Sequence, residues 1–83
     1  MQVYVSEGFP PVQADNARDA AHIFAGRRAR LVFGDGGYCM SARLRSVDGA
    51  KSVYSANLAR TLPGTDERAV EGQSVVLTVI SVV

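Results

Sequence analysis

The most apolar stretch of the chain is its last one, Ser74–Val83, in which every residue except the serines is apolar or β-branched. Such residues favour a pleated strand over a short helix. With the two-residue period of a strand, one face carries Val75, Leu77, Val79, Ser81 and Val83, and the other carries Val76, Thr78, Ile80 and Val82. Because both faces are apolar, we predict a central strand covered on both sides. A membrane-spanning helix needs about 20 apolar residues, so the run is too short for one.

The N-terminal pattern predicts a second strand. Residues Gln2–Ser6 alternate, with Val3 and Val5 on one face. The strand ends before Pro10 and Pro11, because proline has no amide donor for a sheet. Val12–Ala14 is predicted to return as a short strand of a hairpin.

A helix is predicted to follow. Asp15 and Asn16 are good N-cap residues, and Asn16 with Asp19 resembles a capping box. At about 100° per residue, one apolar arc forms. Its members are Ala17, Ala20, Ala21, Phe24, Ala25, Leu31 and Val32.

The end of this helix has two interpretations. We prefer a helix to about Phe33, with Gly34 as a left-handed C-cap. The alternative ends the helix at Gly26, since glycine costs about 1 kcal/mol in a helix interior, and makes 29–33 a strand.

Residues Tyr38–Val47 alternate again and precede Asp48-Gly49, a hairpin signal. The predicted inward residues are Tyr38, Met40, Ala42 and Leu44, and the outward ones are Cys39, Ser41, Arg43 and Arg45. A three-residue loop, 48–50, pairs Leu44 with Tyr54, Ala42 with Ala56, Met40 with Leu58, Arg45 with Val53, Arg43 with Ser55, and Ser41 with Asn57. A two-residue loop that places Leu44 opposite Val53 mixes the faces, so side-chain parity favours the longer loop.

Residues 59–73 show no clear period, so we predict a long loop with a turn at Leu62–Asp66 and one helical turn at Glu67–Glu71. The predicted fold class is therefore α+β, a single small domain over residues 1–83. One amphipathic helix packs on a mainly antiparallel sheet of four to five strands, with the C-terminal strand central.

Composition narrows the class of protein. The chain has 83 residues, a net charge of +1, one cysteine and one histidine. A disulfide framework and a four-ligand zinc site are therefore excluded within one chain. With no secretory signal visible, we expect a cytoplasmic protein. Arginine outnumbers lysine eight to one, which we interpret as the coding bias of a GC-rich bacterium or its mobile genetic elements.

No motif predicts catalysis. A Cys39–His22 nucleophilic pair is the one candidate, but the helix pattern puts His22 on the solvent side. The glycines of 34–37 follow a helix instead of preceding one, so they do not form a phosphate loop. We therefore expect no enzyme activity, no catalytic, metal or cofactor site, no small-molecule substrate and no membrane partner.

The charged residues supply two candidate binding surfaces. If the helix end lies beside the outward hairpin face, a basic patch forms that suits phosphates or an acidic protein. Its members are Arg27, Arg28, Arg30, Arg43, Arg45, Lys51 and Arg60. The second surface is an acidic loop of Asp66, Glu67 and Glu71, whose spacing matches no calcium site. No aromatic residues interleave with the arginines to stack on bases.

These features lead to a functional hypothesis. One helix can cover only one face of the last strand, so a partner protein or a second copy is expected on the other. The leading hypothesis is a small non-catalytic binding protein acting through macromolecular contacts. Within that class we consider a phage or mobile-element inhibitor of a host complex, of the anti-CRISPR sort. The alternatives are a nucleic-acid-binding module that uses the arginine patch and a homodimeric structural protein.

Overall fold

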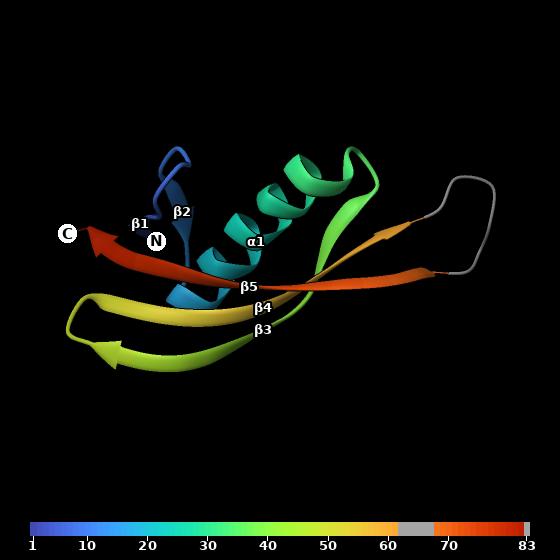
Figure 1. The fold of residues 1–83 in the computed structure, drawn as a ribbon. Helices are drawn as coiled ribbons and strands as arrows, with labels where there is room; N and C mark the ends of the chain where they lie inside the picture. Colours follow the sequence, from blue (N-terminus) through green and yellow to red (C-terminus); the bar gives the residue numbers. More distant parts are fainter. Residues whose placement is uncertain (62–67, 83) are drawn as a thin grey trace.

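The computed structural model describes the backbone of residues 1–61 and 68–82, and the side chains of 1–60 and 73–82. One helix and five strands follow one another as β1 (Gln2–Val5), β2 (Val12–Ala14), α1 (Ala17–Phe33), β3 (Gly37–Asp48), β4 (Lys51–Thr61) and β5 (Arg68–Val82). The strands form one antiparallel sheet in the order β2-β1-β5-β4-β3 (Figure 1). The predicted fold class is confirmed, including the central C-terminal strand.

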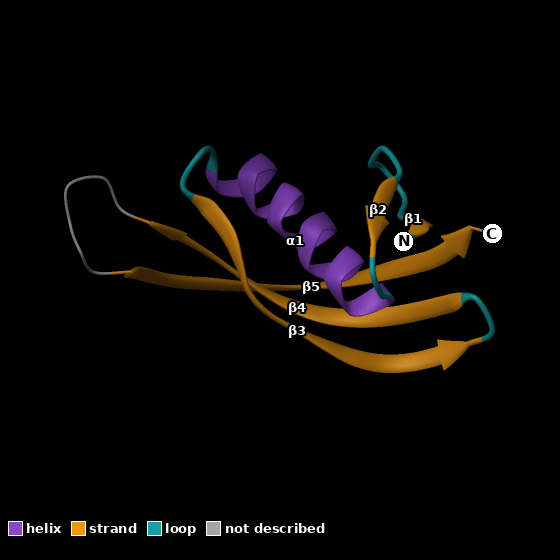
Figure 2. Cartoon of the chain, turned by 180° about the vertical axis from the view of Figure 1, so that it is seen from behind, coloured by secondary structure: helices purple, strands orange, loops and turns teal. Residues whose placement is uncertain are grey.

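The sheet curls into a half-barrel around α1 (Figures 1 and 2). We call the side toward α1 the concave face and the opposite side the convex face. The right-handed twist between neighbouring strands lets one helix cover much of a concave face. The core lies between α1 and the concave face of the sheet, and it is built from small residues and a few large ones. Its fully buried large side chains are Phe24, Leu58 and Val79, and its alanines are Ala14, Ala20, Ala21, Ala25, Ala29, Ala42 and Ala56.

Helix α1 begins at the predicted cap. The Asn16 Oδ1 atom accepts a hydrogen bond of 2.9 Å from the Asp19 backbone N–H. The helix continues through Gly26 to Phe33, which excludes the shorter alternative. Gly34 caps it, and its N–H donates to the Arg30 carbonyl at 2.9 Å. Its φ of +82° is positive as predicted, but its ψ of −159° lies outside the left-handed helical region, in one that is essentially restricted to glycine.

The buried side of α1 differs from the predicted arc at its C-terminal end. Leu31 is 73% exposed and Val32 is 45% exposed, whereas Ala29 is fully buried. The buried row Ala21, Ala25, Ala29 advances by about 40° around the axis at each step of four residues. A helix that crosses a curled sheet packs through such an inclined row, so an arc parallel to the axis was the wrong template.

The β3–β4 register is confirmed in its middle and wrong at both ends. The confirmed pairs are Leu44–Tyr54, Ala42–Ala56, Arg43–Ser55 and Ser41–Asn57. The register shifts at Met40 and at Arg45, so Leu58 pairs with Cys39 and Val53 pairs with Ser46. These shifts are β-bulges, which insert an extra residue into one strand. Asp48 pairs with Lys51, so the loop is the two residues Gly49 and Ala50.

The bulges also change which β3 side chains are buried. Cys39 packs against the core and Met40 is 50% exposed, the reverse of the prediction. Leu44 keeps its predicted partner but is 49% exposed, because the β3–β4 hairpin extends beyond the first turn of α1 (Figure 1).

The predicted long loop and helical turn are wrong. Strand β4 continues to Thr61, and β5 begins at Arg68, where Thr61 pairs with it. A register shift between Leu58 and Arg60 interrupts the alternation, which is why no period was visible in the sequence. The predicted turn at Leu62–Asp66 falls wholly on residues 62–67, which lie outside the described residues. In the described part of the chain, α1 is neither long nor apolar enough to span a bilayer.

Candidate binding surface

Strand β5 sends its alternate side chains into two different environments. On the concave face Leu77 is 7% exposed and Val79 is fully buried. On the convex face Val76 is 70%, Ile80 is 40% and Val82 is 46% exposed. The expectation that β5 is covered on both faces is therefore wrong for the described residues, since α1 covers the concave face alone.

The exposed apolar side chains of β5 are continuous with those of its neighbours. The register places Val3 beside Val82 and Val5 beside Ile80, both on β1. On the other side it places Val53 beside Thr78. We call this set the convex surface. Its residues are Val3, Val5, Val53, Val76, Thr78, Ile80 and Val82.

A polar border adjoins the convex surface. The Asn57 amide donates to Ser41 Oγ at 3.2 Å, and the Ser74 hydroxyl donates to Asn57 Oδ1 at 2.9 Å. This ladder crosses β3, β4 and β5 and fixes the orientation of Asn57. Beside it lies a hollow of about 440 Å³ lined by Ser41, Ala42, Arg43, Arg45, Ser55 and Asn57, which we call the β3 hollow. The convex face therefore changes from apolar at β1 and β5 to basic at β3.

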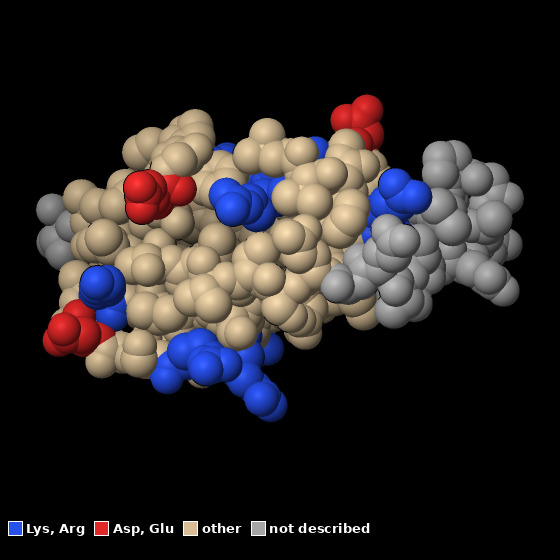
Figure 3. All heavy atoms as spheres, viewed as in Figure 1, with Lys and Arg blue, Asp and Glu red and all other residues tan. Residues whose placement is uncertain are grey.

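The predicted basic residues gather in separate groups (Figure 3). Arg43 and Arg45 lie around the β3 hollow, and Lys51 pairs with Asp48 across the hairpin end. Arg43 also lines a second hollow of about 380 Å³ with Arg18 and Tyr54.

The arginines of α1 and β4 occupy other places. Arg27 donates to the Pro10 carbonyl at 3.3 Å, so it braces the β1–β2 loop. Arg28 and Arg30 are exposed on α1, and Arg60 is partly buried near the start of β3, whose Gly37 it pairs with. The structure does not bring Arg27, Arg28 and Arg30 beside Arg43 and Arg45, because this part of α1 lies over the concave face while these two border the hollow on the convex face. Arg18, in the first turn of α1, is the α1 arginine that shares a hollow with Arg43.

The predicted acidic surface is outside the structural description. Asp66 and Glu67 lie outside the described residues. The backbone of Glu71 belongs to β5, and its side chain is not among those described.

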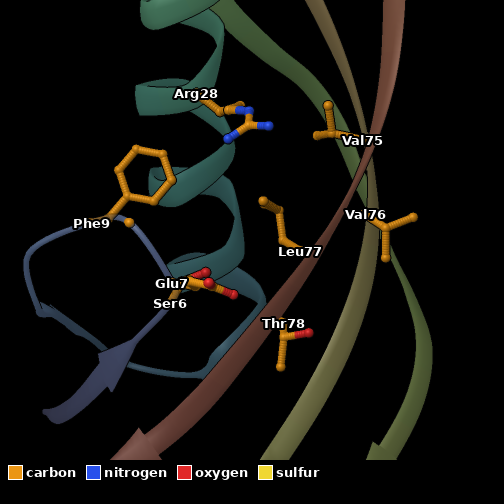
Figure 4. A pocket seen from close by; sticks show the side chains of 9 residues that line it. Ser6, Glu7, Phe9, Arg28, Val75, Val76, Leu77 and Thr78 are labelled. Atoms are coloured by element: carbon orange, nitrogen blue, oxygen red, sulfur yellow. The ribbon is translucent and has the colours of Figure 1, made fainter.

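A groove that the sequence analysis did not predict lies along the edge of β5 that faces away from β4 (Figure 4). Its volume is about 370 Å³. The lining comes from three elements and comprises Ser6, Glu7, Gly8 and Phe9 of the β1–β2 loop, Arg28 of α1, and Val75–Thr78 of β5. Phe9 is held in place by Phe24, with ring centroids 6.0 Å apart. We call this the β5 groove. The signal in the sequence was the contrast between a first strand ended early by prolines and a long last strand.

The titratable groups of the core do not form a reactive centre. The Cys39 thiol donates to the Ser41 carbonyl at 3.4 Å. Burial raises the pKa of the Cys39 thiol more than hydrogen bonding with the Ser41 backbone lowers it, so the reactive thiolate is disfavoured. Burial also raises the pKa of Tyr54, against the opposing charge of Arg18. His22 is exposed on α1. The described residues contain no group of three acidic, cysteine or histidine side chains that could hold a metal ion.

The fold and these surfaces define a small α+β protein in which the described residues leave one face of the sheet uncovered, with an apolar part at β1 and β5 and a basic part at β3. Neither protein-family models, nor curated proteins, nor solved structures give a match to the chain.

Proposed function

We propose that this chain is a non-catalytic binding protein that docks its convex surface on a partner protein. The observation that carries the proposal is the exposure of Val76, Ile80 and Val82 on the central strand of the sheet. Clustered β-branched side chains of this kind are usually removed from water by a partner.

The charges beside the surface specify the partner. Arg43 and Arg45 border it on β3, and the described convex rows contribute one carboxylate, Asp48, whose partner in the strand register is Lys51. A second copy would bring further positive charge to this border. An apolar partner surface with acidic residues at its rim is the complement.

A narrower form of the proposal is an inhibitor, encoded by a phage or mobile element, that occupies a host complex in the anti-CRISPR manner. The small size of the chain and a docking surface without nearby reactive groups support it.

Site-specific photocrosslinking tests the proposal. A photoreactive amino acid is placed at Val76 and, as a control, at Leu31, which is equally exposed at 73% but lies on α1. In cells of the source organism, the Val76 position should crosslink to one protein that the Leu31 position does not reach. Crosslinks to a second copy alone would replace the proposal with the homodimer.

The purified partner then allows direct measurement of affinity. Ile80→Asp should weaken binding by about tenfold or more, since it places a charge in the apolar contact. Arg43→Glu should weaken binding at low salt and less at high salt, because its contribution is electrostatic. Leu31→Asp should leave the affinity unchanged. Equal affinities for all these variants would refute docking through the convex surface.

A second candidate, nucleic-acid binding, is favoured by the β3 hollow alone. Two guanidinium groups and the Asn57 amide surround it, which is a donor set suited to phosphate. It predicts an affinity for duplex or single strands that falls steeply with salt. Failure to bind either one more tightly than about 10⁻⁴ M would remove this candidate.

A further inference from the structure

The β5 groove lies along a sheet edge that β1 leaves open. Strand β5 extends from Arg68 to Val82, but β1 pairs only with its residues Ile80, Ser81 and Val82. β1 ends at Val5 and the chain turns away, closed by a hydrogen bond of 3.2 Å from the Phe9 N–H to the Ser6 carbonyl. Among the described residues, no strand continues β1 beside Val75–Thr78.

The backbone groups that face this edge can be identified from one hydrogen bond. The Ser81 N–H donates to the Ala50 carbonyl at 2.9 Å, on the β4 side. Successive residues of a strand direct their backbone groups to opposite edges. Val79, Leu77 and Val75 therefore also bond toward β4, and the N–H and C=O groups of Val76 and Thr78 point into the β5 groove.

We propose that the β5 groove binds an extended peptide segment of a partner, which adds to the sheet as a strand antiparallel to β5, in line with β1. This site goes beyond the proposed function, since it uses the backbone edge of β5, whereas the convex surface uses side chains, although Val76 and Thr78 belong to both. Unpaired donors and acceptors at strand spacing fit the backbone of another strand better than any other ligand.

The walls of the groove specify the side chains of the segment. Val75 and Leu77 point toward α1, whereas Val76 points away (Figure 4). A segment residue opposite Leu77 would therefore face Leu77 and Phe9, which favours a small apolar side chain. Arg28 lies toward the Val75 end and Glu7 toward the Thr78 end (Figure 4). An antiparallel segment would accordingly carry a basic residue on the N-terminal side of the apolar one and an acidic residue on its C-terminal side.

The free protein provides the first measurement. In hydrogen exchange followed by NMR, the amides of Val76 and Thr78 should exchange much faster than those of Val75, Leu77 and Val79. Equal protection of all five in a dilute monomer would show that the edge is already paired and would overturn the proposal. Protection of Val76 and Thr78 that increases with protein concentration would assign the edge to a second copy and would overturn it too.

The second measurement uses a defined probe, the acetylated and amidated peptide Lys-Thr-Val-Thr-Glu-Thr. At millimolar concentration it should protect the Val76 and Thr78 amides. N-methylation of the two threonines that flank the valine removes the donors that face β5 and should weaken binding roughly thirtyfold, given about 1 kcal/mol for each of the two hydrogen bonds. N-methylation of the valine, whose amide faces away, is the matched control. A peptide that binds equally well with either modification, or does not bind at all, would refute strand addition.

Charge reversal tests the orientation. Arg28→Glu leaves an acidic group at both ends of the groove, so it should abolish the preference for the original peptide over the peptide with lysine and glutamate swapped. Arg43→Glu, on the other side of the sheet, should leave peptide binding unchanged while it weakens binding of the convex-surface partner. Failure of one proposal is thus separable from failure of the other. An unaltered preference in Arg28→Glu would contradict the proposed antiparallel orientation.

Discussion

The two faces of β5 show how little residue type alone determines burial. Val79 and Val76 are the same residue, three positions apart on one central strand, yet one is fully buried and the other is 70% exposed. The difference comes from what lies above each face. On the concave face α1 completes the core, and on the convex face no described part of the chain does.

On the concave face the sheet and α1 lie very close together. Most of its helix side is alanine, and Gly37 of β3 meets the helix backbone so closely that a Cβ there would lie 2.3 Å from the Ala29 carbonyl oxygen. Small residues thus set the distance between helix and sheet, and a few large side chains fill the remaining space. The convex face carries β-branched residues suited to a flat contact with another surface. The two faces therefore differ in what covers them: the concave face packs against α1, and the convex face is the one that we propose contacts a partner.

The largest expected effect comes from the helix side of the concave core. Phe24→Ala should lower the free energy of unfolding by about 3–5 kcal/mol, because it removes a fully buried aromatic ring and its contact with Phe9. Total stability is only about 4–12 kcal/mol for a chain of this size, so thermal denaturation should show a strongly lowered melting temperature. Ile23→Ala, at a position 38% exposed, should cost much less. Equal losses in the two variants would mean that α1 does not pack as described.

The close approach of helix and sheet can be tested with two glycines. Gly37→Ala should destabilise the protein by about 3 kcal/mol, since the atoms that its Cβ meets belong to the backbone and cannot rotate away. Gly26→Ala should instead stabilise it by about 0.5–1 kcal/mol, because no atom lies within 4 Å of a Cβ there and alanine favours the helix. Chemical denaturation measures both. Changes of the same sign would contradict the packing at Gly37.

The comparison between the faces is tested most directly by two valines. Val79→Ala should cost about 2 kcal/mol, from lost burial and the cavity left behind. Val76→Ala should change stability by less than about 0.5 kcal/mol in the isolated monomer. If Val76→Ala costs as much as Val79→Ala, and more so at higher protein concentration, the convex surface is buried against a second copy.

Much of the fold was predictable from local pattern. The cap at Asn16 and the alternation around Ala42 depend on near neighbours in the chain, and both were confirmed. The central position of β5 followed from its apolar character on both faces. That character shows how much apolar surface a strand carries, but it does not show what covers the surface.

The sequence-based predictions are wrong where tertiary geometry overrides the alternation of apolar and polar residues. The bulges at Met40 and Arg45 insert residues that alternation cannot detect, and they reverse the burial of Cys39 and Met40. The basic patch required α1 and the hairpin arginines to lie on one face, which depends on how the sheet curls. The β5 groove depends on where β1 stops relative to β5, a property of register that no single motif encodes.

The smallest expected effect concerns Cys39, at the rim of the concave face. Because burial raises the pKa of its thiol, less thiolate is present at a given pH than for an ordinary cysteine, and alkylation at neutral to mildly alkaline pH should be slow. In a Cys39→Ala background, Met40→Cys places a thiol on the exposed bulge and should react several times faster. The raised pKa also means that an unfolded chain loses this proton first, so stability should decline slightly as the pH rises above about 8.5. Faster alkylation of Cys39 than of the bulge thiol would mean that the bulge does not turn Cys39 toward the core.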